Sequence, residues 1–447
     1  MAAAGGAPGG GGPGGAREFD VGVWGATGFT GRRVLEALVR AAAGRAGAGG
    51  GGARARRRLA AAGRSAARTR AAAEAAAAAA GQPPGACAVV VADAGDQGSL
   101  EALAARCRVV VACVGPFARL GEPMVAACVA AGTHYLDVCG EPNFIEAAQL
   151  KYGGAGGLAE RSGALVCSAV GFDSVPCDLG VLLAREGLLE AGAVPASVES
   201  FLTLRTGPAG GTAHFATWEA LINGFSTQGR LREVRRALRG RDGDAPGPKP
   251  PGPRPRARVG WEPRVGAYAL PFFGSDASVV RRTQQGLEEA PVHHAALFTV
   301  GSALTVGLFA AFGSVLQTLV RWPWGRRLLL KYPRVFSFGV FSHAGPSEEQ
   351  IAQTSFDMTF FGRGFSDAAA AGGAPGARPD REVVYRIAGP EPGYIACGIF
   401  VSEAALVLLE EPGNLPPPGV HTPGALLWGT TYLSRLRAAG ITVEALS

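Results

Sequence analysis

The stretch Gly25-Ala26-Thr27-Gly28-Phe29-Thr30-Gly31 constrains the fold of this chain more than any other part of its sequence. It follows an apolar run, Glu18 to Trp24, and opens a segment, Phe29 to Arg40, whose apolar residues recur at helical spacing. A strand, a tight turn and a helix in that order are typical of the first unit of a dinucleotide-binding domain. Because the chain contains 68 glycines, the placement of the motif carries the prediction, and its glycines alone do not.

Each glycine of this motif has its own expected role. Gly25 permits the tight turn, Gly28 lets a pyrophosphate approach the backbone, and Gly31 lets the helix pack closely on the strand. The amides exposed at the helix N-terminus then bind the phosphates. The residues predicted to contact the cofactor here are Gly25, Thr27, Gly28, Phe29 and Gly31.

Short apolar strands alternate with helical segments through the first part of the chain. The expected strands are Leu59 to Ala62, Ala88 to Ala92, Val109 to Val114, Tyr135 to Val138 and Ala164 to Ser168, with helices such as Ser99 to Ala105 and Pro123 to Ala131 between them. The alternation predicts an α/β fold, a Rossmann-type doubly wound parallel sheet over residues 17–195. Two Ala/Gly stretches, 41–53 and 66–86, lack apolar periodicity and are predicted to be loop or helix-end expansions.

The pattern changes beyond residue 195. Strands such as Val198 to Leu204 and Val383 to Ile387 are mixed with long insertions, which predicts a second, α+β domain over 196–390 for substrate binding or dimerisation. Its Pro-, Arg- and Gly-rich stretches, 240–260 and 368–380, are expected to be linkers. At the two ends of the chain, residues 1–16 are expected to form a disordered tail, and residues 391–447 a C-terminal segment that packs back on the core.

The residues after the second strand bear on the choice of cofactor. In Ala62-Gly63-Arg64-Ser65 the acidic residue that would bind the ribose hydroxyls of NAD is missing. Arg64 and Ser65 suit a 2′-phosphate, because a guanidinium matches a phosphate dianion with paired donors, so NADP is favoured over NAD. An ordinary surface arginine remains the alternative. Asp93 is placed to reach the adenine amino group, and Gly115-Pro116 to run beside the ribose and nicotinamide.

Hydride transfer also needs a proton donor, and the sequence does not single one out. None of the seven tyrosines is followed four positions later by lysine, so a short-chain dehydrogenase mechanism is not expected. Polar residues at the carboxyl ends of later strands are His134, Asp137, Glu141, Asp173 and Asp178. Asp173 is the catalytic candidate among them, although Asp173-Ser174 before Pro176 also suits a helix cap. In the second domain, His214, a second catalytic candidate, and Trp218 are expected to close over the substrate.

Neither a metal site nor a nucleic-acid interface is predicted. The eight cysteines include no CxxC pair and no spacing typical of zinc ligands, so they are interpreted as small core residues in a reducing compartment. The net charge of +7 is concentrated in Arg54 to Arg70 and Arg230 to Arg258. Because no aromatic residues are interleaved with these arginines, a solvated flexible face is the favoured interpretation.

Several of these motifs occur together in one known family. They are Gly25 to Gly31, Ala62 to Ser65, Cys113 to Pro116, Gly140-Glu141-Pro142, Gly171 to Asp178, Phe272 to Asp276, Val279 to Thr283 and Thr422-Pro423-Gly424. The chain from about Phe19 onward thereby resembles the saccharopine dehydrogenase-like oxidoreductases. The resemblance implies a Rossmann domain with an inserted second domain, a nicotinamide cofactor, and similarity to the trans-acting enoyl reductases of glycolipid synthesis. It also implies an intracellular protein at lipid droplets or other membranes, with the mitochondrion as a further compartment.

A run of 26 residues without a charge, Ala295 to Val320, is long enough to cross a bilayer, which needs about 20. Tryptophans and basic residues typical of a membrane interface follow it, from Arg321 to Arg327. A full crossing would split one fold across the membrane. The prediction is therefore a segment that lies in the interface, or dips into it as a hairpin at Gly307 or Gly313. A buried helix or a dimer contact is the alternative.

Two functions from different classes fit these observations. The first is an oxidoreductase that prefers NADP and acts on a lipid or other apolar substrate, with a contribution to glycolipid metabolism and a homodimer left open. The second is a non-catalytic lipid-surface scaffold, or a nucleotide sensor, that retains the Rossmann fold. The missing proton donor favours the second. Saccharopine is disfavoured as the substrate because no cluster of arginines accompanies the Asp173 motif.

Overall fold

Seven parallel strands form the first sheet, in the order β15-β6-β5-β4-β1-β2-β3. Their bounds are β1 Phe19–Trp24, β2 Leu59–Gly63, β3 Cys87–Val91, β4 Cys107–Ala112, β5 His134–Asp137, β6 Leu165–Cys167 and β15 Gly419–His421. The predicted Rossmann-type sheet is thereby confirmed. The chain leaves β1 toward β2 and β3 and then returns to β4 on the other side, so the sheet has its switch point at the carboxyl end of β1.

The coordinates form a computed structural model that describes residues 17–47, 57–242, 249–255, 257–286, 291–372 and 377–446. The tail predicted at 1–16 lies outside these residues. So do parts of the 41–53 stretch and of the linkers at 240–260 and 368–380.

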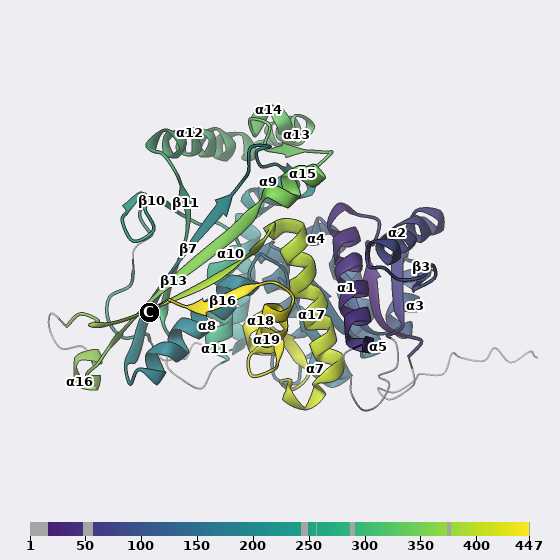
Figure 1. The fold of residues 1–447 in the computed structure, drawn as a ribbon, viewed down its shortest axis with the longest axis horizontal. Helices are drawn as coiled ribbons and strands as arrows, with labels where there is room; N and C mark the ends of the chain where they lie inside the picture. Colours follow the sequence, from purple (N-terminus) through teal and green to yellow (C-terminus); the bar gives the residue numbers. More distant parts are fainter. Residues whose placement is uncertain are drawn as a thin grey trace, which may run out of the picture.

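Helices cover both faces of the first sheet (Figure 1). They are α1 Phe29–Gly47, α2 Ala66–Ala79, α3 Gln97–Arg106, α4 Phe117–Leu120, α5 Glu122–Ala131, α6 Pro142–Tyr152, α7 Leu158–Ser162 and α17 Cys397–Glu410. The prediction of a loop or helix-end expansion at 66–86 is wrong, because a complete helix, α2, begins at Ala66 and occupies most of this stretch. Alanine has the highest helix propensity, and Ala72, Ala73, Ala76 and Ala77 form the buried stripe of α2. Other alanines flank this stripe, so no apolar periodicity was visible.

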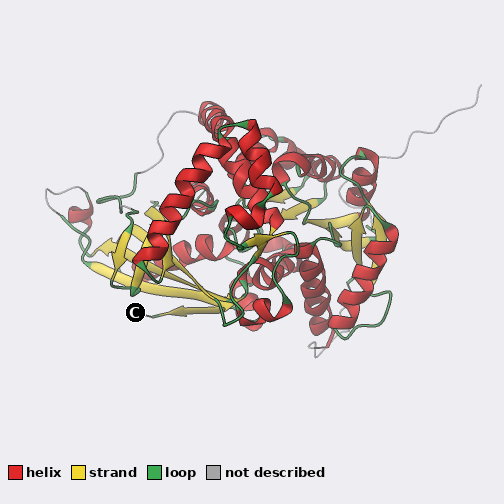
Figure 2. Cartoon of the chain, turned by 90° about the horizontal axis from the view of Figure 1, so that it is seen from above, coloured by secondary structure: helices red, strands yellow, loops and turns green. Residues whose placement is uncertain are grey.

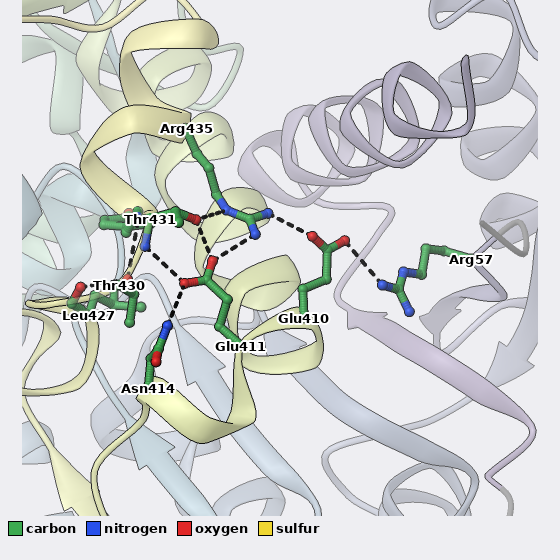
Figure 3. A network of polar contacts seen from close by, with 9 residues as sticks. Arg57, Glu410, Glu411, Asn414, Leu427, Thr430, Thr431 and Arg435 are labelled. Carbon is green, nitrogen blue, oxygen red and sulfur yellow. Dashed lines mark hydrogen bonds and ion pairs between the residues drawn. The ribbon is translucent and has the colours of Figure 1, made fainter. Parts of the chain in front are cut away.

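The C-terminal part of the chain returns to the first sheet. α17 packs on α1, and β15 extends the sheet beyond β6. Figure 3 shows the ionic network at the end of α17, where Arg435 lies between Glu410 and Glu411 while Arg57 reaches Glu410 from the opposite side. Arg57 precedes β2, so the network ties the last part of the chain to the first.

A second sheet has the order β16-β14-β13-β7-β11-β10-β9, antiparallel except where β7 pairs with β11. Its strands are β7 Val194–Arg205, β9 Gly260–Glu262, β10 Ala267–Pro271, β11 His293–Val300, β13 Ser355–Phe365, β14 Arg381–Pro390 and β16 Thr442–Ala445. α8, Val175–Glu190, packs on this sheet, and α11, Asp276–Gln285, packs on α8. The two sheets lie at opposite ends of the molecule with helices between them (Figure 2).

A small group of elements, which we call the cap, projects from the long strands of the second sheet (Figure 1). It comprises β8 Ala213–His214, α9 Phe215–Ser226, α12 Ala303–Val320, α13 Pro323–Lys331, α14 Pro333–Phe336 and β12 Phe341–Ser342. Its core is separate from the main core and consists of Trp218, Ile222, Leu316, Val320 and Leu329. The remaining short elements are α10 Gln228–Asp242, α15 Glu348–Gln353, α16 Ala368–Ala371, η1 Pro392–Ala396, η2 Pro412–Asn414, α18 Pro423–Leu427 and α19 Tyr432–Ala438.

The apolar run 295–320 is divided between a strand and a helix. Residues 295–300 belong to β11, and α12 begins only at Ala303. α12 continues unbroken through Gly307 and Gly313, so the hairpin alternative is wrong. Among the described residues, two helices are long and apolar enough to cross a membrane, but the one that ends at Glu410 is 83% buried whereas α12 is 11% buried. The buried-helix alternative therefore fails for α12, which leaves most of its apolar surface exposed.

Candidate cofactor and active site

The glycine motif lies at the switch point of the first sheet, between β1 and α1. Gly25 has φ +90, and a Cβ on it would lie 2.7 Å from the Val114 side chain. A Cβ on Gly31 would lie 2.1 Å from the carbonyl oxygen of Gly25, so only glycine lets α1 approach the turn this closely. A Cβ on Gly28 would meet only that same oxygen, at 3.3 Å. The open space over Gly28, at the N-terminus of α1, fits a dinucleotide pyrophosphate.

Arg64 and Ser65 follow β2 at the turn into α2. The Arg64 side chain is exposed, and the Ser65 hydroxyl caps α2 by accepting from the Arg68 amide at 3.4 Å. Arg68, in the first turn of α2, is exposed as well. Thr27 lies close by, because a Cβ on Gly63 would be 3.6 Å from its methyl carbon. Two guanidinium groups at a helix N-terminus fit a phosphate dianion. Arg68 was not predicted as a cofactor residue, because arginines recur throughout residues 54–70 and the pattern does not distinguish it from the others.

Asp93 lies after β3, where it was predicted. Its Oδ1 accepts from the Gly95 amide at 3.0 Å, and its own amide donates to the Ser99 hydroxyl at 3.0 Å. These bonds hold the turn between β3 and α3, so one carboxylate oxygen has a structural role. The other oxygen, Oδ2, is the group that could accept from an adenine amino group.

Gly115 and Pro116 connect β4 to α4 through a cis peptide bond. The next two amides, of Phe117 and Ala118, donate to the Glu141 carboxylate at 2.8 and 3.2 Å. Because Glu141 follows β5 and the two amides follow β4, the Glu141 side chain joins the carboxyl ends of these two neighbouring strands. Burial raises the pKa of Glu141, against the lowering effect of these two bonds. The sequence placed Glu141 at this edge correctly, but its carboxylate is engaged in structure.

Asp137 holds the turns after β5 and β6 together. Its carboxylate accepts from the Cys139 amide at 2.9 Å, the Ser168 hydroxyl at 2.8 Å and the Ala169 amide at 3.0 Å. Burial raises its pKa to about 6 despite these bonds. His134 was expected at the same edge and is not there, because it opens β5 at the amino end, where its Nδ1 accepts from the Leu165 amide.

Asp173 lies in the turn between β6 and α8, over the end of β5. A Cβ on Gly140 would be 2.6 Å from its Oδ2. The alternative of a helix cap holds for position only: Ser174 is the N-cap of α8, but its side chain makes no capping hydrogen bond. Burial raises the pKa of Asp173.

Asp276, at the start of α11, is buried beside Asp173. The two helix starts are joined through the hydroxyls of Ser174 and Ser275, 2.8 Å apart. Burial, and next the charge of Asp173, raise the pKa of Asp276 to about 7. Its Oδ1 is buried without a hydrogen-bond partner. Asp276 was not predicted as a partner of Asp173, because a single aspartate about one hundred residues further along the chain gives no local signal that the two carboxyl groups lie together.

His214 lies against the glycine motif. Its ring stacks on that of Phe29 with centroids 5.4 Å apart, and Phe29 makes an edge contact with Tyr394 at 4.6 Å. The Tyr394 hydroxyl accepts from the His214 amide at 2.9 Å. His214 Nδ1 accepts from the Ala216 amide, so the neutral ring carries its proton on Nε2. Burial lowers the pKa of this imidazole, and the nearby His343 lowers it further.

Two residues expected near the substrate have structural roles instead. Trp218 is fully buried in the cap and donates from Nε1 to the Leu329 carbonyl at 3.0 Å, so it does not close over a ligand. Asp178 accepts from the Thr283 hydroxyl and the Gly424 amide, both at 2.7 Å. It thereby joins α8 to α11 and α18, which accounts for the motifs at Val279 to Thr283 and Thr422 to Gly424.

The structure thus brings His214 to the glycine motif and Asp173 to the ends of β5 and β6, without a direct contact between the two. The segment Glu391 to Cys397 runs between them. The Glu391 carboxylate accepts from the amides of Gly393, Tyr394 and Ile395, which fixes Tyr394 below His214. At the other end, a Cβ on Gly171 would lie 2.8 Å from the Cys397 sulfur. The position of this segment between the two candidate residues was not predicted, because it contains no motif that indicates a contact with residues far away in sequence.

Comparison with known families supports the cofactor site. Residues 21–156 match the family described as the saccharopine dehydrogenase NADP binding domain. That range contains every predicted cofactor residue, from Gly25 to Pro116. The site therefore takes NADP or the closely related NAD.

Full-length relatives extend the similarity beyond this domain. A saccharopine dehydrogenase-like oxidoreductase of Homo sapiens is 38% identical over 364 residues, which cover 80% of this chain and 82% of the relative. A lipid droplet localized protein of Caenorhabditis elegans is 33% identical over 449 residues, covering 96% and 98%. A Mycobacterium tuberculosis protein described as a trans-acting enoyl reductase is 32% identical over 448 residues, covering 96% and 97%.

A solved structure shares the fold across the chain. Saccharopine dehydrogenase (L-Glu forming) of Saccharomyces cerevisiae aligns with a TM-score of 0.51, covering 96% of this chain and all of its own, at 12% identity. The aligned part of the chain includes both sheets, so the two proteins share this fold.

Proposed function

This chain belongs to the saccharopine dehydrogenase-like oxidoreductases, and on that basis we propose that it reduces an apolar, lipid-type substrate with NADPH as the hydride donor. The observation that carries the proposal is the position of the cap. One end of the cap places His214 on Phe29 of the glycine motif, and the cap also carries α12, an apolar helix that is only 11% buried. An apolar surface and a cofactor site thus belong to one connected structure.

The cofactor would be held by groups at three strand ends. Amides at the start of α1 would bind the pyrophosphate over Gly28, and Arg64 and Arg68 would bind the 2′-phosphate. Asp93 Oδ2 would accept from the adenine amino group. When bound, the reduced nicotinamide supplies a hydride.

Two side chains are proposed to handle the proton. In its neutral form His214 carries its proton on Nε2, and its lowered pKa favours that form, so the ring would donate a hydrogen bond from Nε2 to the negative charge that develops on the substrate. Asp173 has a raised pKa, so its carboxyl group retains a proton to higher pH than an exposed aspartate would. The charge of Asp173 in turn raises the pKa of Asp276, so Asp276 is the carboxyl group of the two that keeps its proton to higher pH.

A lipid droplet or membrane surface is the proposed location. The chain continues into the folded body on both sides of α12, because β11 pairs with β7 and α13 packs under α9. A crossing of the bilayer by α12 would divide this fold across the membrane, so we propose a position along the surface. The nematode relative's name and the mycobacterial relative's description both support a link to lipids.

Titration of the purified protein with NADPH and NADH, followed by fluorescence, tests the cofactor part. We expect Gly28→Asp to abolish binding of both, since its carboxylate would occupy the pyrophosphate position. Arg64→Ala should remove the preference for NADPH, and Arg70→Ala, which removes an exposed arginine within α2, should not. No binding by folded wild-type protein would overturn the proposal and leave a lipid-surface scaffold. Tight binding without turnover of any enoyl or carbonyl lipid would favour a nucleotide sensor.

A further inference from the structure

The cap carries more than half of the large apolar side chains that the described residues leave exposed. Trp322 and Trp324 are 55% and 60% exposed, and Phe338 is 79% exposed. Phe338 contacts Phe312 of α12, so the segment after α14 continues the surface of that helix. We call this surface the apolar platform. Its members are Leu304, Leu308, Phe309, Val315, Trp322, Trp324, Tyr332, Val335, Phe338 and Val340.

The segment that carries the apolar platform contains charged side chains of one sign only. No aspartate or glutamate occurs between residues 291 and 347, whereas this range contains Arg321, Arg326, Arg327, Lys331 and Arg334. Within the described part of the chain, none of these five cations forms an ion pair. Their positive charge is therefore uncompensated by the protein and favours an anionic partner.

Two of these cations line a cavity of about 550 Å³ between α13, α14 and the loop before α15. Lys331 and Arg334 line it together with Ser342, His343 and Gly345. The back of the cavity is next to the cofactor loop, because a Cβ on Gly345 would lie 2.9 Å from the Phe29 ring and 3.3 Å from His214. The cavity thus runs from the edge of the apolar platform to the glycine motif.

We propose that this cavity binds the phosphate-bearing headgroup of an anionic phospholipid while the apolar platform inserts into the same leaflet. A guanidinium and an ammonium side by side suit a phosphate. Tryptophans next to basic residues suit the boundary between headgroups and acyl chains. The inference rests on the part of the proposed function that puts the protein at a lipid surface, and names its partner.

A second copy of the chain fits this surface less well. A symmetric dimer would bring the same patch of both subunits together, and with it two sets of unpaired cations. A membrane that contains anionic lipid instead supplies the missing negative charge and accepts the apolar side chains at once. The position of Gly345 further means that an acyl substrate drawn from that leaflet would reach the protein beside Phe29 and His214.

Vesicle flotation of the full chain tests the inference, with vesicles of phosphatidylcholine alone or mixed with phosphatidic acid. We expect tighter binding to the mixture. The double variant Lys331→Gln, Arg334→Gln should lose about tenfold or more of that affinity, since each removed charge near an anionic surface weakens binding severalfold. Arg232→Gln with Arg236→Gln, two exposed arginines on α10, removes the same charge elsewhere and should change binding little. Trp322→Ala with Trp324→Ala should weaken binding to both kinds of vesicle.

The outcomes separate the possible errors. Equal losses for the α10 and cavity variants, or none for the cavity variant, would overturn the headgroup site while the lipid-surface function survives. Saturable binding of inorganic phosphate that the cavity variant abolishes, without any preference for phosphatidic acid vesicles, would show a site for soluble phosphate and overturn the lipid assignment. Absence of binding to any vesicle would overturn this inference and the proposed location together. Unchanged NADPH affinity in each variant confirms that it is folded.

Discussion

The aromatic ring of Phe29 stacks on the imidazole of His214, although 185 residues of sequence separate the glycine motif from the cap. Phe29 is the residue after Gly28, so a change in the position of the cap would directly affect the predicted pyrophosphate site. The contact also screens one face of the imidazole from water. Its removal should therefore affect both the cofactor and the titration of the histidine.

Phe29→Ala is expected to raise the pKa of His214 toward its ordinary value, because burial is the main cause of the lowered pKa. Titration of the His214 ring by NMR measures this directly. Phe298→Ala, which removes an aromatic contact with Phe309 elsewhere in the second domain, serves as the control. An unchanged His214 pKa in Phe29→Ala would show that the stack does not determine its environment.

The glycine motif allows a prediction that separates packing from binding. A Cβ on Gly31 would lie 2.1 Å from a backbone oxygen that cannot move without disturbing the turn, whereas a Cβ on Gly28 would lie 3.3 Å from the same oxygen. Gly31→Ala should therefore lower the free energy of unfolding by about 1–3 kcal/mol. Gly28→Ala should leave stability within about 0.5 kcal/mol and reduce NADPH affinity. Denaturant unfolding and NADPH titration of both variants check this, and equal stability losses would contradict it.

The sequence predicted the first sheet well because the signals for it are local. Apolar strands, the glycine turn and the missing acid beside Arg64 can each be read within about ten residues. Two errors arose where the local signal was uniform. Alanines on every face concealed the buried stripe of α2, and an unbroken apolar run concealed the junction between β11 and α12.

The contacts between distant segments could not be predicted in this way. Tyr394 fixes His214, and Asp276 lies beside Asp173, yet no periodicity links residues so far apart in sequence. Polar residues at strand ends were identified, but not their partners. Asp137, Glu141 and Asp178 proved to be bonded within the structure, whereas Asp173 has no such set of donors.

The pair Asp173 and Asp276 predicts how stability depends on pH. The pKa of Asp276 is about 7 in the folded protein, against about 3.9 for an unfolded aspartate, so the folded state holds this proton more tightly. The free energy of unfolding should then fall as pH rises from about 4 to about 7. Asp276→Asn, which cannot ionise, should flatten this dependence and stabilise the protein above about pH 7 by on the order of 2–4 kcal/mol. Chemical denaturation across this range measures it. Lower stability of Asp276→Asn at every pH would mean that the carboxyl is required for packing.

The network at the end of α17 predicts that the free energy of unfolding rises with pH, in a lower pH range than the one in which Asp276 titrates. Burial alone would raise the pKa of Glu411, but bonds from Thr431, Arg435 and Asn414 outweigh it and lower the pKa to about 2 (Figure 3). Since an unfolded glutamate titrates near 4.3, this carboxylate stabilises the fold above about pH 4, and the contribution is lost as pH falls toward 2. Glu411→Gln should lower the free energy of unfolding at neutral pH by on the order of 2–3 kcal/mol, and the variant should lose less stability on acidification than the wild type.

The matched control is Glu444→Gln. The half-exposed Glu444 carboxylate pairs with Arg386 at 3.4 Å, and its removal should lower the free energy of unfolding by less than about 1 kcal/mol. Equal effects of the two variants would mean that the bonds of Glu411 to Asn414, Thr431 and Arg435 stabilise the C-terminal segment no more than an exposed ion pair does.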